Sequence, residues 1–429
     1  MGVSQVRMRI KGRIDRALGW LLALAPILSI YKTGVGEINV GDIALIGIIL
    51  MSLCAWSRGS RTVGRCRFAG YFCPFFAIAF IQLIARGQGS FGHFWPNWLR
   101  IVTLVYLVDI AARSDISGDA LRDALIWLGT GLSLLLLAQA AADRILGIPL
   151  FPYLRNIPLN YEVGAVELIA RQLRWRGMGA WRYSSIFPEP AHFAQYALLS
   201  LAAAVFGGER LLQDRRRTLC AAIITLAIFL SQSANGVLLV IPLWGIFLLQ
   251  SLRGARRANV LIGFGVALIA CMVLLARLSN VIDSALDHVR SAAETGYATT
   301  GNLRLLQGLA VFRQLGPLEK LIGVGYGNLR SYLTDNWIRT AYNSTVGSEY
   351  MNGFSTVLVC SGWIGLLLYL WVWTRLYFEN GALMNRVALM LLSALFCTSN
   401  MFYSELTVTY LVFVRCAGMD VSGRRCDDG

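Results

Sequence analysis

Residues 121–142 read LRDALIWLGTGLSLLLLAQAAA, and after Arg122 and Asp123 this run carries no charged side chain. An α-helix rises about 1.5 Å per residue, so about 20 apolar residues cross the roughly 30 Å hydrocarbon core of a bilayer. The run therefore predicts a membrane-spanning helix, and it sets the fold class of the chain.

Similar runs recur along the whole chain. Its 429 residues are 56% hydrophobic and only 15% charged, which excludes an ordinary soluble domain. The apolar runs lie near residues 17–31, 38–55, 68–84, 97–112, 121–142, 190–207, 218–232, 234–250, 258–276, 352–374, 384–399 and 401–416. We therefore expect an all-α polytopic integral membrane protein with about 12 transmembrane helices.

The basic residues indicate how these helices are oriented. Lysine and arginine number 39 against 24 acidic residues, a net charge of +15. The basic clusters fall at alternate ends of the runs: Arg7 to Arg16, Arg58 to Arg67, Arg215 to Arg217, Arg253 to Arg257, Arg375 with Arg386, and Arg415 with Arg424 and Arg425. By the positive-inside rule both termini are expected in the cytoplasm, and the charge indicates no nucleic-acid partner. The basic leader has no small-residue cleavage site, so the first run is expected to remain as a helix.

This orientation divides the chain into five parts. Helices 1–5 occupy residues 1–142, and a first external, periplasmic loop follows at 143–189. Helices 6–9 occupy residues 190–276, a second periplasmic loop spans 277–351, and the C-terminal helices and cytoplasmic tail occupy 352–429. Loops of this length are usually functional, and we expect both to fold as caps. In the second loop, Leu305, Leu309 and Phe312 follow a helical spacing that predicts one apolar face.

No metal or cofactor signature is present in the sequence. The nine cysteines lie in or beside apolar runs or in basic cytoplasmic segments, where small apolar packing residues are expected rather than disulfides or metal ligands. No zinc-ligand spacing, nucleophile elbow or Walker sequence occurs. We therefore expect chemistry that needs neither a metal nor a cofactor.

The most informative stretch is residues 171–193, RQLRWRGMGAWRYSSIFPEPAHF, which leads directly into an apolar run. Arginines, among them Arg176 and Arg182, precede Glu189 and His192 at a membrane surface. Arginine binds phosphate through a two-pronged contact, whereas glutamate and histidine can accept a proton from a sugar hydroxyl.

Two interpretations stay open for each candidate base. Pro190 is expected in the first helical turn, which places Glu189 at the N-cap. There Glu189 either caps the helix or serves as an active-site carboxylate. His192 follows in the same turn, where it is either an interfacial polar residue or a base.

The aromatic residues of this stretch also have two interpretations. They either stack on sugars or anchor the chain at the membrane interface, and they are Trp175, Trp181 and Tyr183.

The second loop carries further candidates. It offers Arg290, Arg304, Arg313, Arg330 and Arg339, with Asn343, Glu349 and Asn352 beyond. The run Gly323-Val-Gly325-Tyr-Gly327 is not a nucleotide-binding fingerprint, and it predicts a tight turn where loop backbone approaches a helix. The turn at residues 231–236, SQSANG, either faces the same cavity as the loops or simply ends a helix.

These motifs and their order resemble those of the O-antigen polymerase and ligase superfamily. The residues that carry the likeness are residues 182–193 (RYSSIFPEPAHF), the turn at 231–236, Arg304 before residues 321–328 (LIGVGYGN), and residues 361–365 (SGWIG). Within the superfamily, the chain looks most like the Wzy-type repeat-unit polymerases.

The resemblance implies a GT-C-like membrane glycosyltransferase in the bacterial inner membrane. Its substrate would be an undecaprenyl-pyrophosphate-linked oligosaccharide, polymerised on the periplasmic face into exopolysaccharide, capsule or O-antigen. A chain-length regulator and export machinery would be partners besides the lipid bilayer. The resemblance also suggests roles for the candidate residues: Arg176, Arg182 and Arg304 for the pyrophosphate, Glu189 or His192 for acceptor activation, and Tyr183, Asn343 and Glu349 for sugar binding.

Three other functions remain open on the sequence. A ligase of the same superfamily would transfer a finished glycan from the same carrier. A polysaccharide transporter or flippase would need charged residues deep within several spans, and Asp42 and Asp109 lie near span ends while Glu405 lies in the last span. A non-enzymatic assembly protein is the fourth possibility.

Overall fold

The computed structural model describes residues 3–35, 38–57, 91–108, 116–154, 157–160, 164–179, 181–208, 214–252, 300–340, 347–379 and 381–416, together with residues 77, 81 and 211. The helices within these ranges are α1 Val3–Leu28, α2 Val40–Ser57, α4 Phe91–Tyr106, α6 Gly118–Leu146, α7 Ala165–Gly177, α8 Pro190–Phe206, α9 Arg215–Leu230, α10 Ala234–Leu252, α13 Thr300–Gln314, α14 Pro317–Ile322, α15 Leu329–Asp335, α16 Gly353–Glu379, α17 Leu383–Thr398 and α18 Glu405–Cys416.

The described part of the chain is mostly helical, and some of its helices could cross a membrane. Three helices are long and apolar enough to cross a bilayer, over Gly118–Leu146, Ala234–Ser251 and Gly353–Phe378, and shorter apolar helices cover Val40–Cys54, Pro190–Phe206 and Leu383–Thr398. Ten of the predicted apolar runs overlap a helix. Of the other two, 258–276 lies outside the described residues, and only residues 77 and 81 of 68–84 are described.

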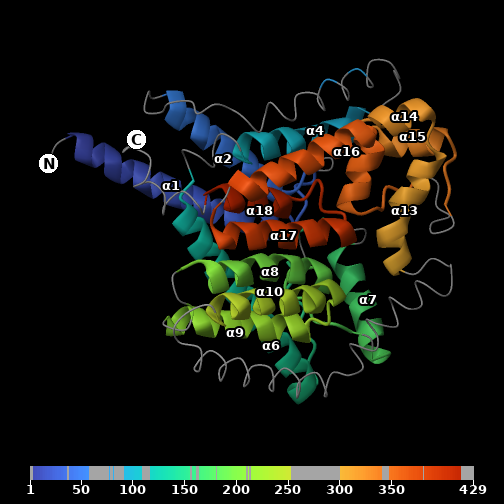
Figure 1. The fold of residues 1–429 in the computed structure, drawn as a ribbon. Helices are drawn as coiled ribbons and strands as arrows, with labels where there is room; N and C mark the ends of the chain where they lie inside the picture. Colours follow the sequence, from blue (N-terminus) through green and yellow to red (C-terminus); the bar gives the residue numbers. More distant parts are fainter. Residues whose placement is uncertain are drawn as a thin grey trace.

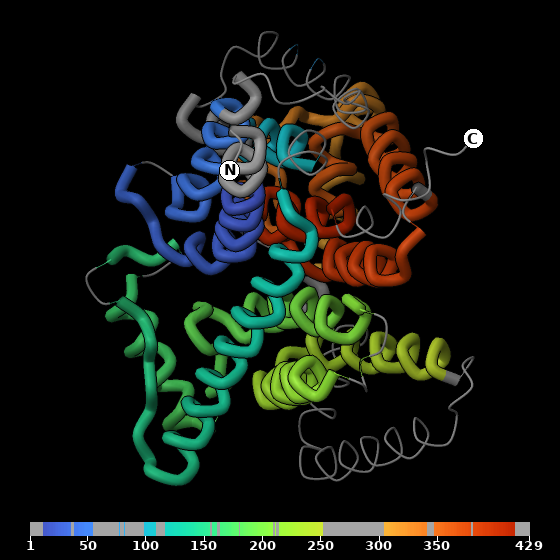
Figure 2. Tube along the Cα trace, turned by 90° about the vertical axis from the view of Figure 1, so that its left-hand side faces the viewer, coloured from blue at the N-terminus to red at the C-terminus, as the bar shows by residue number. Residues whose placement is uncertain are grey.

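The helices pack in two groups (Figures 1 and 2). One group contains α6, α8, α9 and α10, and the other contains α16, α17 and α18. Helix α17 lies against α8, while α1 contacts α2, α6 and α18, so residues from the two ends of the chain share one core. Tyr196 of α8 and Tyr410 of α18 are fully buried at the junction and donate hydrogen bonds to Ala23 O and Gln195 O.

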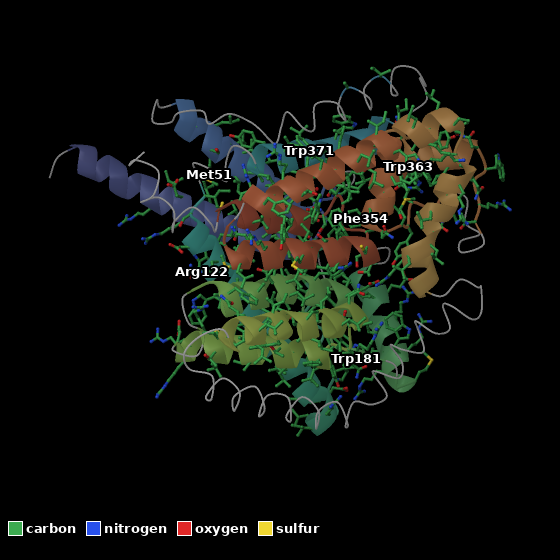
Figure 3. All side chains as sticks on the ribbon, viewed as in Figure 1. Met51, Arg122, Trp181, Phe354, Trp363 and Trp371 are labelled. Atoms are coloured by element: carbon green, nitrogen blue, oxygen red, sulfur yellow. The ribbon has the colours of Figure 1, made fainter. Side chains whose placement is uncertain are left out.

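Segments that the sequence assigns to one face meet at one end of the helices. The connection after α1 pairs with the loop before α7, because Lys32 N donates to Pro158 O and Asn160 N donates to Ile30 O. The turn after α9 reaches the turn after α17 through Asn235 and Ser399. Arg122 lies at the opposite end from Trp181 (Figure 3).

Both long loops contain helices in their described parts. The first loop contributes α7, and the second contributes α13, α14 and α15. All four helices lie toward the right of Figure 1.

The apolar face predicted for α13 is only partly correct. Phe312 is 7% exposed and packs edge-on against Trp363, but Leu305 and Leu309 are 46% and 43% exposed. The buried face is rotated toward Gly308, because a side chain there would overlap Ser355 of α16. The missing side chain lets the two helices approach closely, and this contact rather than the leucine spacing selects the buried face.

The glycine run after α14 forms the predicted close approach of loop backbone to a helix. Val324 N and Gly325 N donate to the carbonyls of Val359 and Cys360 in α16. Helix α16 is kinked where Gly362 adopts φ +66°, and a Cβ on Gly323 would lie 2.2 Å from the Cys360 backbone. The run therefore joins the second loop firmly to a long helix.

Candidate functional site

The first turn of α8 presents a carboxylate that does not cap its own helix. Glu189 occupies the N-cap with extended backbone, but its side chain accepts no capping hydrogen bond. Its Oε2 instead lies 3.9 Å from Nη2 of Arg304 on α13. The position expected from Pro190 is confirmed, and the carboxylate is directed toward a residue that is distant in sequence.

Four of the predicted residues come together here. Arg182 and His192 each lie within electrostatic range of both Glu189 and Arg304. Partial desolvation lowers the pKa of the Arg182 guanidinium, the carboxylate of Glu189 raises it, and the like charge of Arg304 lowers it further. We call Arg182, Glu189, His192 and Arg304 the arginine–glutamate cluster. It combines two cations, one carboxylate and one imidazole.

Hydrogen bonds fix both the side chain and the backbone of Arg304. Its Nε donates to Tyr350 Oη at 3.0 Å, and its backbone carbonyl accepts from Asn352 Nδ2 at 3.0 Å. Asn352 also accepts from Ser355 N in the first turn of α16. Arg304 therefore takes its position from α16 as well as from its own helix.

The loop that carries Arg182 and Glu189 runs back along α6. Tyr183 Oη donates to Asp143, Ser185 N donates to Gln139, and Ser185 Oγ donates to Leu132 O. Gln139 in turn donates to Ser185 O. Ser185 has φ +57°, a conformation that costs a residue with a Cβ about 1–2 kcal/mol, and these hydrogen bonds hold it there.

The first loop supports the same segment from the other side. Tyr153 Oη donates to Phe187 O at 3.0 Å, and Gln172 of α7 donates to Tyr153 Oη at 3.1 Å. Burial raises the pKa of Tyr153, so this phenol stays protonated and can donate. Helix α7 thus fixes the backbone immediately before Pro188 and Glu189.

Two predicted substrate residues are engaged elsewhere. Arg176 donates to Asp143 at 2.5 Å and to Gly147 O at 2.8 Å, so the structure pairs it with α6 rather than with the arginine–glutamate cluster. Tyr183 is buried, its ring lies against Trp181, and burial together with Asp143 raises the pKa of its phenol. Both side chains support the loop in this structure, because each donates a hydrogen bond to the same carboxylate.

The remaining predicted sugar-binding residues are placed less directly. Asn343 lies outside the described residues. Glu349 lies within electrostatic range of Cys360 and Tyr403, on the side of the second loop that faces α16.

The sequence interpretation missed a second polar group, next to the first. Arg100 of α4 donates to both oxygens of Asp42, at 3.1 and 3.0 Å, and its Nε lies 3.8 Å from Glu405 Oε1. Asn39 donates to the same Glu405 oxygen at 2.6 Å. We call Asn39, Asp42, Arg100 and Glu405 the Arg100 network. The signal was present in the sequence, since ionisable residues within apolar runs mark functional positions by default.

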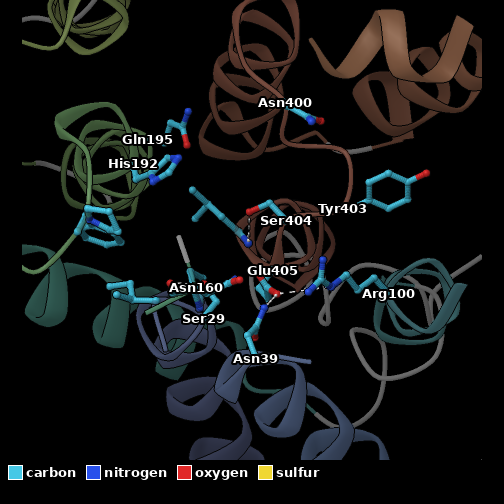
Figure 4. A pocket seen from close by; sticks show the side chains of 15 residues that line it. Ser29, Asn39, Arg100, Asn160, His192, Gln195, Asn400, Tyr403, Ser404 and Glu405 are labelled. Carbon is cyan, nitrogen blue, oxygen red and sulfur yellow. Dashed lines mark hydrogen bonds and ion pairs between the residues drawn. The ribbon is translucent and has the colours of Figure 1, made fainter. Parts of the chain in front are cut away.

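A cavity of about 310 Å³ separates the Arg100 network from the first turn of α8 (Figure 4). Asn39, Arg100 and Glu405 line one side, and Pro188, His192 and Gln195 line the other. His192 therefore belongs to both the cavity and the arginine–glutamate cluster. Among the described residues, no group of three or more histidine, cysteine or acidic side chains is arranged to hold a metal ion.

The comparisons with known proteins give no family assignment. No protein-family model matches this chain, and neither a curated protein nor a solved structure shows a match to it.

Proposed function

We propose that this protein polymerises undecaprenyl-pyrophosphate-linked oligosaccharide repeat units on the outer face of the bacterial inner membrane. The growing chain is transferred from its lipid carrier to the incoming repeat unit. The observation that carries the proposal is the arginine–glutamate cluster, which joins a loop, α8 and α13 at one end of the apolar helices.

The cluster suits a reaction in which pyrophosphate leaves an anomeric carbon. Negative charge accumulates on the pyrophosphate as that bond breaks, and fixed guanidinium groups stabilise it without a metal. The 3.9 Å pair of Glu189 and Arg304 is longer than a charge-assisted hydrogen bond of about 2.7–2.9 Å. A pyrophosphate can therefore compete for Arg304, and Glu189 or His192 then accepts the proton of the attacking hydroxyl.

The depth of the cluster also suits a lipid-linked substrate. Helix α6 has 29 residues and is about 43 Å long, more than the roughly 30 Å hydrocarbon core. The loop before α8 runs back from Asp143 to Leu132, about 16 Å along that helix. The segment that leads to Glu189 therefore lies beside α6 rather than beyond its end, which suits a substrate whose phosphates lie at the membrane surface.

Reconstitution tests the polymerase proposal. The purified protein is placed in liposomes with lipid-pyrophosphate-linked repeat units, and the products are followed as a ladder on a gel. We expect Arg304→Ala to slow ladder formation about 10²–10³-fold, the effect of removing one preorganised charge-stabilising donor. Glu189→Gln should slow it about 10²–10⁴-fold, the usual contribution of a general base.

Asp123→Asn is the matched control, because this carboxylate is exposed and pairs with Arg122 at the other end of the helices. It should leave the ladder unchanged. A folded wild-type protein that makes no ladder from its own repeat unit contradicts the proposal. Transfer of a preformed glycan to a different acceptor would then identify a ligase, and movement of the lipid-linked unit across the bilayer without transfer would identify a flippase.

A further inference from the structure

We infer that the cavity between the Arg100 network and the first turn of α8 binds one neutral sugar residue, the residue of the incoming repeat unit that supplies the attacking hydroxyl. That the cavity binds a sugar follows from its lining alone, whereas the acceptor role rests on the proposed function.

The cavity is lined by side chains with hydrogen-bonding capacity to spare. Gln195 is 6% exposed, and its amide group has no hydrogen-bond partner in the described part of the chain. The amides of Asn160 and Asn400 likewise have none there, and both residues are exposed. Buried polar groups are normally paired, and an amide both donates and accepts, as sugar hydroxyls require.

Glu405 gives the cavity a preference among ligands. Its side chain is only 7% exposed, Oε1 accepts from Asn39, and the residue lines the cavity. A buried carboxylate on a cavity wall favours a ligand that donates a hydrogen bond, such as a hydroxyl group. Figure 4 shows Glu405 between Arg100 and Asn39 on the cavity wall.

The charges of the Arg100 network select against an acidic sugar. Asp42 and Glu405 supply two carboxylates against the single guanidinium of Arg100, and the fork of that guanidinium is already occupied by Asp42. A uronate in the cavity would bring a third carboxylate close to Asp42 and Glu405, and the repulsion of like charges makes this costly. Neither Arg182 nor Arg304 lines the cavity, whereas His192, which does line it, lies within electrostatic range of Arg304.

This separation of charge assigns the two substrates to different places beside the candidate bases. An anionic pyrophosphate suits Arg182 and Arg304, and a neutral sugar suits the cavity. His192 lines the cavity and also senses the charges of Glu189 and Arg304. A hydroxyl held in the cavity would thus lie beside His192 and near Glu189, while the leaving group is held by the arginines outside the cavity. The volume of about 310 Å³ lies at the lower end of the range for ligand sites, which suits one sugar ring rather than a whole oligosaccharide.

Saturation-transfer NMR on the purified protein in lipid nanodiscs tests the inference without any lipid-linked substrate. The probes are methyl glycosides of glucose, galactose, mannose and N-acetylglucosamine, with methyl glucuronide as the acidic counterpart. We expect transfer to at least one neutral glycoside and none to the glucuronide. Glu405→Gln should weaken that binding about tenfold or more, because a hydrogen bond to a charged group is lost.

Asn160→Ala provides a second variant outside the buried network, and Asp123→Asn is the control that should bind as wild type does. Absence of transfer to every neutral glycoside overturns the inference, as does equal binding of the glucuronide or unchanged binding in both variants. The outcome is separable from that of the ladder assay. If the protein binds a glycoside but makes no ladder, the sugar site stands and the polymerase proposal fails. If it makes a ladder but binds no glycoside, the polymerase proposal stands and the sugar site fails.

Discussion

Asp143 holds two side chains of the loop before α8. It accepts from Arg176 at 2.5 Å and from Tyr183 at 2.8 Å. We expect Asp143→Asn to lower the unfolding free energy by about 1–2 kcal/mol, because both hydrogen bonds lose their charged acceptor. Thermal unfolding in detergent measures this as a lower melting temperature.

The same pair separates a supporting role for Arg176 from a substrate-binding role. In a double-mutant cycle, Arg176→Ala and Asp143→Asn should cost less together than the sum of their separate effects, because they remove one interaction. Additive effects on stability, with loss of polymer in Arg176→Ala alone, would show that Arg176 contacts substrate after all.

At the scale of residues, the sequence predicts those residues of the candidate site that are adjacent along the chain. Pro188 and Pro190 predict where α8 begins, and with it the N-cap position of Glu189. The sequence does not distinguish Arg176 from Arg182, since both are arginines in one basic stretch and only the fold brings Asp143 to one of them. The Arg100 network was missed as a unit because its members come from three helices and the turn before one of them.

At the scale of elements, the contact of α14 with α16 depends on two glycines. Gly323 and Gly362 both have positive φ, and a Cβ on either would come within 2.4 Å of the opposite backbone. Alanine at either position should lower the unfolding free energy by at least about 2 kcal/mol, because a crowded backbone must move and the left-handed conformation is strained.

Gly131 in α6 provides the control for these glycine substitutions. No atom lies within 4 Å of the position that its Cβ would occupy. Gly131→Ala should leave the melting temperature unchanged or raise it, because alanine favours a helix interior over glycine by about 0.5–1 kcal/mol. If all three substitutions shift the melting temperature equally, the α14–α16 contact does not depend on its glycines.

The helices themselves are the part of the fold that the sequence predicts best. Long apolar runs leave few alternatives to a helix, because every backbone group must be hydrogen-bonded within the bilayer. The packing of the loop helices is predicted less well. The leucines of α13 follow a helical period, yet Gly308 selects the buried face, and a glycine carries no hydrophobic signal.

At the scale of the whole molecule, the two ends of the helices differ in what they carry. One end gathers α7, α13, the cavity and the arginine–glutamate cluster, and the other carries Arg122 and Asp119. The proposed topology places the first end outside the cell membrane. In a cysteine-free background, a membrane-impermeant thiol reagent should label Asn336→Cys in intact cells and Asp119→Cys only after permeabilisation.

Both positions are exposed, so a difference in labelling reports the side of the membrane rather than burial. Equal labelling of both positions in intact cells, or labelling of Asp119→Cys alone, would contradict the topology. It would also contradict the proposal that the arginine–glutamate cluster lies on the outer face of the membrane.

The hydrogen bond from Asn352 to Arg304 has a consequence for the energetics of the proposed reaction. A charged side chain on a free loop must first turn toward a developing anion, and the work of that turning is added to the barrier as reorganisation energy. Here the carbonyl of Arg304 is tied to the residue that begins α16, and its Nε is tied to Tyr350. The guanidinium therefore lies near Glu189 before any substrate arrives, and in the proposed reaction little reorganisation would remain to be done as the pyrophosphate departs.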